Sequence, residues 1–303
     1  GGSSSGSGAA VGAGMVPAAT GTQVRGSILR PACYNGTWAL KPSWGAINTR
    51  GGFPSPPSIG HLGFLAGSLA DTWISCYWLS QNAGGDAGHP SLKGHPHLPK
   101  SQKPKRLARV DTAGWADTSE PVREIFNEMV FKLERQGVEI VSRREDPELE
   151  SYEQDMVQLS KVIEIVLAYE YRWPLMMYLD KNPELLGDRV FNRAKAAAEI
   201  TPEQYEEALE WSISARVRHE ALSSKYDAML TLNGTGAAPE GMAIGNAIYG
   251  EQSSVLGVPT LNAPLLAHDG MPLGIQILGY FRHDYDLIAI GHWMIGAILR
   301  TEG

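Results

Sequence analysis

The chain has 303 residues, of which 43% are apolar and 19% charged, and its formal net charge is −7. This length and composition are typical of one large globular domain over residues 1–303 and exclude a disordered chain. No basic cluster could neutralise phosphates and no apolar run approaches the roughly 20 residues of a membrane helix, so we expect neither nucleic acid nor a membrane as partner.

The N-terminal quarter is rich in Gly, Ser and Ala, and Asp71 is its first acidic residue. Small residues predict a short helix over 9–15, and a short buried strand is predicted over 18–22. The sequence Ser68-Leu69-Ala70-Asp71 is a capping box, which predicts a helix that runs to about Leu79. The Gly, Pro and His residues from 84 to 104 indicate a loop.

The next elements alternate between strand and helix. We predict a strand over 106–111, a helix over 121–136 and a strand over 138–141. Pro121 near the start of this helix and Gly137 just past its end follow the usual asymmetry of helix termini. A strand, a helix and a strand in succession imply a parallel pair.

Residues from about 150 to 223 are helical throughout, and Thr201-Pro202-Glu203-Gln204 is a second capping box. We expect the region 145–225 to cover the sheet. Buried strands are predicted over 227–232, 259–266 and 272–279, with a turn at His268-Asp269-Gly270 between the last two. An amphipathic helix is predicted over 284–298. The elements together predict an α/β fold with a mixed, twisted β-sheet surrounded by helices.

The two cysteines, Cys33 and Cys76, are too few for a disulfide framework, and no Cys-x-x-Cys pair suggests structural zinc. With no secretory signal at the N-terminus, this usage indicates a reducing, cytoplasmic location. The chain begins at Gly1 rather than at Met. We therefore expect a fragment whose N-terminal part is missing.

Several glycine-rich motifs follow one another in a fixed order. They are Gly1-Gly2-Ser3-Ser4-Ser5-Gly6-Ser7-Gly8, Gly21-Thr22-Gln23-Val24-Arg25-Gly26-Ser27-Ile28-Leu29-Arg30-Pro31-Ala32, Gly36-Thr37-Trp38-Ala39-Leu40-Lys41-Pro42-Ser43-Trp44-Gly45 and, near the end, Asn262-Ala263-Pro264 and Gly270-Met271-Pro272-Leu273-Gly274-Ile275-Gln276. The first motif alone is typical of a flexible linker. Together, in this order and spacing, the motifs resemble the amidase signature family over nearly the whole chain, and the helical middle is the least specific part.

The resemblance implies that Ser27 is the nucleophile and that Ser3, whose preceding peptide bond is cis in the family, is the bridging serine. A lysine completes the family's triad. The backbone amides of the oxyanion hole fall on Val24, Arg25, Gly26 and Ser27. Residues that would support these groups are Gly2, Ser4, Thr22, Gln23 and Arg30.

The chemistry explains these residue types. A serine hydroxyl is a poor nucleophile at neutral pH and needs a base in contact with it. In the arrangement that the resemblance implies, a desolvated, neutral lysine takes the proton through Ser3 while Ser27 attacks the amide carbon. The resulting acyl-Ser27 ester is then cleaved by water.

The sequence departs from the family pattern in several places. Arg25 stands where the family has Gly, Gln23 stands where it has Asp, and Arg30 lies one position later than the usual Arg. A side chain at Arg25 is difficult to reconcile with a positive φ and could narrow the acyl pocket or contact an acidic group of the substrate. The alternative is that Arg25 and Arg30 are only solvated or structural charges. No lysine precedes Ser3, and Lys41 matches a structural lysine of the family. We expect the catalytic lysine upstream of this chain, which as written should be inactive or severely impaired.

Other motifs in the sequence give weaker evidence for other kinds of site. Gly2-Ser3-Ser4-Ser5-Gly6 fits the nucleophile elbow of α/β-hydrolases, but that motif needs a preceding strand. The spacing of His89, His95 and His97 matches no zinc motif, and we expect no metal and no cofactor. The segment 245–253, a loop leading into a helix, would contact the substrate or cap that helix.

The leading hypothesis is an amidase that cleaves a small or aryl amide through acyl-Ser27. One alternative is a non-catalytic scaffold or binding member of the same fold, and another is an A-type subunit of the amidotransferase that acts on glutamyl-tRNA. The expected partners are a small-molecule amide substrate and, in a homodimer, a second copy of the chain. No residue pattern names the amide.

Overall fold

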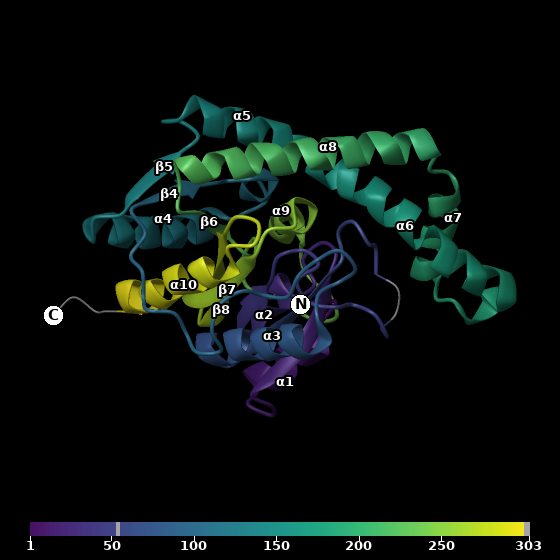
Figure 1. The fold of residues 1–303 in the computed structure, drawn as a ribbon, viewed down its shortest axis with the longest axis horizontal. Coiled ribbons are helices and arrows are strands. Elements are labelled where there is room, and N and C mark those ends of the chain that lie inside the picture. The colour runs from purple at the N-terminus through teal and green to yellow at the C-terminus, as the bar shows by residue number, and fades with distance from the viewer. Residues whose placement is uncertain (53–54, 300–303) are drawn as a thin grey trace.

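A computed structural model describes residues 1–52 and 55–299 (Figure 1). In these residues an eight-stranded sheet has the order β1-β3-β2-β7-β8-β6-β4-β5. Strand β4 pairs in parallel with β5 and β6, whereas the other neighbours are antiparallel. The sheet is therefore mixed, as predicted. Its strands are β1 (Ala18–Gln23), β2 (Trp38–Lys41), β3 (His61–Ala66), β4 (Arg106–Arg109), β5 (Glu139–Ser142), β6 (Ala228–Leu232), β7 (Thr260–His268) and β8 (Met271–Leu278).

Helices surround this sheet (Figure 1). They are α1 (Ser5–Gly12), α2 (Leu29–Asn35), α3 (Leu69–Ala83), α4 (Glu120–Arg135), α5 (Pro147–Asp155), α6 (Leu159–Lys181), α7 (Asp188–Ala198), α8 (Pro202–Ala221), α9 (Ile248–Leu256) and α10 (Asp284–Leu299). Across the described part of the chain, none of them combines the length and the apolar character that crossing a bilayer takes.

The sheet has an apolar cluster on each face. Leu230 and Ile277 pack in one cluster with side chains of α3, α4 and α10. The adjacent residues Met229 and Leu278 pack in a second cluster with Ala215 of α8. Because successive side chains of a strand point to opposite faces, the two helix layers cover opposite faces of the sheet.

The local signals at helix and turn boundaries are confirmed. Ser68 Oγ accepts from the Asp71 N–H at the start of α3, and the capping box of Thr201 opens α8. Asp269 and Gly270 have φ values of 51° and 73° in the turn between β7 and β8. Such left-handed pairs match the twist of a tight hairpin, which is why Asp-Gly is favoured there.

Several elements differ from the sequence prediction. Helix α1 covers Ser5–Gly12 rather than 9–15, because Gly8 and Val11 are the residues that it buries. Helix α2 and strands β2 and β3 were not predicted at all. Helix α10 is not simply amphipathic, since its buried residues include the consecutive run Leu287–Gly291.

The predicted helical region consists of α5 to α8. Ala215 of α8 packs on the sheet, as expected of a cover. Helix α6 instead packs on α9, where Val162 and Val166 join Val255 in a separate cluster. Helices α6 and α7 extend beyond the sheet toward one end of the molecule (Figure 1).

Candidate active site

Ser27 lies in the loop that joins β1 to α2. The Gln23 side chain shapes this loop, because its Oε1 atom accepts from the N–H groups of Ile28 at 3.0 Å and Leu29 at 3.1 Å. The first amides of a helix have no partner within the helix, so Gln23 satisfies two donors at the start of α2. The Arg30 N–H donates to the Gly26 carbonyl at 2.9 Å. This bond connects the residue before Ser27 to the first turn of α2.

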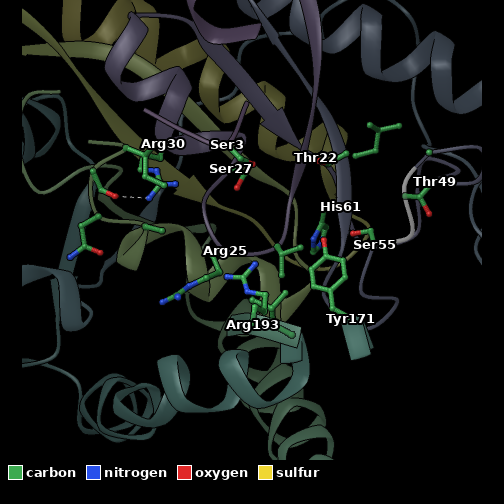
Figure 2. A pocket seen from close by; sticks show the side chains of 18 of the residues that line it. Ser3, Thr22, Arg25, Ser27, Arg30, Thr49, Ser55, His61, Tyr171 and Arg193 are labelled. Atoms are coloured by element: carbon green, nitrogen blue, oxygen red, sulfur yellow. Dashed lines mark hydrogen bonds between the residues drawn. The ribbon is translucent and has the colours of Figure 1, made fainter. Parts of the chain in front are cut away.

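The N-terminal segment brings Ser3 beside this loop. The Gly2–Ser3 peptide bond is cis, as the resemblance implies. The Ser4 N–H donates to the Ser27 carbonyl at 3.2 Å, and Arg30 Nε donates to the Gly2 carbonyl at 2.9 Å. The opening glycine-serine run is thus held in place rather than behaving as a linker, and Figure 2 shows Ser3 and Ser27 side by side.

Ser3 and Ser27 open into a cavity of about 760 Å³. Six of the predicted site residues line it, namely Ser3, Thr22, Val24, Arg25, Ser27 and Arg30. The other predicted residues, Gly2, Ser4, Gln23 and Gly26, are not among the lining residues. Gln23 is fully buried, and Gly26 lies so near α9 that a Cβ there would be 3.2 Å from the Ala247 carbonyl oxygen.

Backbone amides are available next to Ser27. Within the residues that the structure describes, the N–H groups of Arg25, Gly26 and Ser27 donate to no protein acceptor. Arg25 does not adopt a positive φ, so its side chain is compatible with the loop. Unpaired amides beside a nucleophile are the kind of donor that can stabilise an oxyanion.

The Arg25 side chain is held by two carboxylates. Its Nε donates to Glu251 Oε1 at 2.6 Å, and its guanidinium also pairs with Glu164 of α6. Glu251 is 1% exposed and accepts a further bond from Ser160. These contacts tie the loop of Ser27 to α6 and α9.

Other lining residues carried no motif in the sequence. They come from the loop after β2, from β3, from α6 and α7 and from the loop before α9, and include Asn48, Thr49, Arg50, His61, Tyr171, Arg193, Gly245 and Asn246. Among these residues, only those of the segment 245–253 had been singled out in the sequence. Its first residues line the cavity, and most of the rest form the start of α9. His61 is 3% exposed, and burial is the main cause that lowers its pKa well below the ordinary value.

Lysines and the three histidines considered as a metal site do not line the described part of the cavity. The lining contains no lysine. Lys41 is fully buried, donates to the Val258 carbonyl at 2.6 Å, and has a pKa that burial lowers to about 7. His89 packs on Trp44 and His95 on His97, and the described residues hold no group of three or more side chains placed to bind a metal ion.

Comparison with known proteins gives consistent matches. The sequence model described as "Amidase" matches residues 1–288. Mandelamide hydrolase of Pseudomonas putida is 34% identical over 183 residues, which is 60% of this chain and 32% of that protein. The A-type subunit of the glutamyl-tRNA(Gln) amidotransferase of Sulfolobus acidocaldarius is 26% identical over 322 residues, covering 96% of this chain and 67% of its own.

A solved amidase structure has the same fold, with a TM-score of 0.81 and 25% identity over 98% of this chain. The match covers 66% of that solved chain. This chain therefore spans about a third of the mandelamide hydrolase and about two thirds of the other two proteins.

Proposed function

The chain belongs to the amidase family, and from this premise we propose that it hydrolyses a carboxylic amide through an acyl intermediate on Ser27. The observation that carries the proposal is the convergence of Ser3 of the N-terminal segment and Ser27 of the β1–α2 loop on one cavity beside unpaired backbone amides.

In the proposed first step, the Ser27 hydroxyl oxygen attacks the amide carbon while its proton passes to Ser3 and the Ser3 proton passes to a base. The carbonyl oxygen becomes an oxyanion that accepts hydrogen bonds from the backbone N–H groups of residues 24–27. When the C–N bond breaks, the Ser3 hydroxyl donates its proton to the departing nitrogen, which leaves as ammonia or an amine, and the protonated base returns its proton to Ser3.

In the second step, water attacks the acyl-Ser27 ester, and the carboxylic acid leaves while the Ser27 hydroxyl forms again. We propose that the base is a lysine outside residues 1–303, because the described lining contains none. A neutral lysine can take this role once burial has lowered its pKa.

Ammonia release tests the proposal. The chain, expressed together with whatever its reading frame encodes upstream of Gly1, is assayed with aliphatic, aryl and dicarboxylic amides. We expect Ser27→Ala to lower kcat by at least about 10⁴-fold and Ser3→Ala by about 10²–10⁴-fold, since one removes the nucleophile and the other a proton relay. Ser7→Ala is the control, because Ser7 Oγ donates to Thr20 on the surface. A Ser27→Ala protein with wild-type turnover would contradict the proposal.

A second candidate function is that of the A-type subunit in an amidotransferase. It is favoured by the Sulfolobus acidocaldarius relative, a component of a glutamyl-tRNA(Gln) amidotransferase, which matches 96% of this chain. Glutamine hydrolysis that appears only with a partner chain and charged tRNA would identify this function. Hydrolysis of simple amides by the chain without a partner would exclude it.

A further inference from the structure

The lining of the active-site cavity is positively charged. It contains four arginines, which are Arg25, Arg30, Arg50 and Arg193, and its described residues include no Asp and no Glu. The chain as a whole carries a formal charge of −7, so the cavity differs in sign from the average surface. His61 adds no charge there, because burial is the main cause that lowers its pKa well below the ordinary value.

Two of these arginines are engaged by the protein itself. Arg25 pairs with Glu251 and Glu164. Arg30 donates to the carbonyl oxygens of Gly2 and Gly245. Their hydrogen bonds hold the loops around Ser27 together, which accounts for these two residues without a ligand.

Arg193 and Arg50 are different. In the stretches of chain that the structure describes, neither guanidinium has an ion pair or hydrogen bond with another residue. Arg193 lies on α7 and is half-buried in the cavity wall. Tyr171 is close enough to Arg193 for that charge to oppose the rise in the tyrosine pKa that burial causes.

The position of Arg193 suggests which part of a ligand it would meet. In Figure 2 Ser3 and Ser27 lie at the top of the cavity, whereas Arg193 and Tyr171 lie at the bottom. A group bound by Arg193 would therefore be remote from the bond that Ser27 attacks. The volume of about 760 Å³ leaves room for a ligand that reaches both.

We propose that the substrate is an amide that also carries a carboxylate, and that Arg193 binds this carboxylate at the end of the cavity away from Ser27. The inference rests on the proposed amide hydrolysis. A guanidinium matches a carboxylate with two parallel hydrogen bonds, and such charged pairs are stronger than neutral ones. Since the bond is made equally before and during the reaction, its loss should raise KM more than it lowers kcat.

Binding of matched ligands tests the inference. Residues 1–303 carrying Ser27→Ala are titrated calorimetrically with the half-amides of malonic, succinic, glutaric and adipic acid and with the diamides of the same lengths. At least one half-amide should bind about tenfold more tightly than its diamide. Arg193→Gln should remove this preference by weakening the half-amide alone, and Arg193→Lys should keep part of it.

Lys195→Gln is the control, since Lys195 is exposed on the same helix and does not line the cavity, and its substitution removes the same charge. Equal affinity for half-amides and diamides at every length would overturn the inference, as would equal weakening of both by Arg193→Gln.

The ammonia assay with the Ser27 protein separates this inference from the proposed function. If diamides and half-amides are hydrolysed at the same rate and with the same KM, the proposed amide hydrolysis is supported and the proposed carboxylate site is refuted. If half-amides bind selectively but no amide releases ammonia, the proposed carboxylate site is supported and the proposed amide hydrolysis is contradicted.

Discussion

Gln23 organises the loop of Ser27 with both ends of its side-chain amide. Its oxygen accepts from the start of α2, and its Nε2 donates to Ser254 Oγ at 3.1 Å and Ser253 Oγ at 3.3 Å on α9. A carboxylate in this place could accept from α2, but it could not donate to α9. The amide therefore joins α2 to α9, and Gln23 and Ser253 lie 230 positions apart in sequence.

The residue motifs predicted which side chains gather at the cavity, but not what holds them. Ser3, Ser27 and Thr22 could be assigned from motif positions alone. The partners of Arg25 could not, because Glu164 and Glu251 lie 139 and 226 positions away and have no signature of their own. Arg193 was missed for the same reason.

Glu153 is a buried carboxyl below the end of β4. It is 4% exposed, its Oε2 accepts from the N–H groups of Asp111 and Thr112, and its Oε1 has no partner in the described residues. Burial raises its pKa to about 7, although Arg143 opposes the rise. The folded protein therefore holds this proton more tightly than the unfolded chain, in which the pKa is about 4.3.

This difference predicts a pH dependence of stability. A raised folded pKa contributes stability below the unfolded pKa, and that contribution is lost as pH rises from about 4.3 to about 7. Urea unfolding of the wild type should show this fall, and Glu153→Gln should flatten it and be the more stable protein at about pH 8. Glu134→Gln, an exposed change on α4, controls for the lost negative charge. Parallel curves for wild type and Glu153→Gln would refute the prediction.

At the scale of elements, α9 is the support on which the loop of Ser27 rests. Residues 249–256 of this helix are all buried. A Cβ at Gly250 would lie 2.6 Å from Gly26 Cα and 2.7 Å from the Arg25 carbonyl oxygen. Both neighbours are backbone atoms, so the helix and the loop can be this close only because residue 250 is a glycine.

Gly250→Ala should therefore push the loop away from α9. We expect it to lower the free energy of unfolding by about 1–3 kcal/mol, as overpacking does, and to reduce amide hydrolysis. Gly6→Ala in α1 is the matched control, because a Cβ there meets nothing within 4 Å, and it should leave stability unchanged or raise it by up to about 1 kcal/mol. Equal effects of the two variants, measured by urea unfolding, would contradict this account.

Elements with a strong local signal were predictable. The capping residues of α3 and α8, the Pro121 and Gly137 boundaries of α4 and the Asp269-Gly270 hairpin all act through neighbouring backbone atoms. Strands β2 and β3 were missed because they are short and include Lys41 and His61, which resemble surface residues but are buried by distant pairing. Helix α2 was missed because it is seven residues long and buried on nearly every side.

At the scale of the whole molecule, the cavity is assembled from the N-terminal segment, the β1–α2 loop, the loop after β2, strand β3, helices α6 and α7, and the loop before α9. The sequence predicted the mixed sheet and the two serines because these follow from motifs and local periodicity. The far wall of the cavity depends on how α6 and α7 dock, which no local pattern determines.

The most direct test of the central claim is covalent labelling of Ser27 by a fluorophosphonate, read by mass spectrometry of the digested protein. The chain with its upstream coding sequence should carry one adduct, on the peptide containing Ser27, and residues 1–303 alone should react far more slowly if the base is the lysine that we propose lies outside them. Ser27→Ala should prevent the adduct and Ser3→Ala should slow it. An intact, amide-hydrolysing protein that is labelled elsewhere, or not at all, would contradict the account.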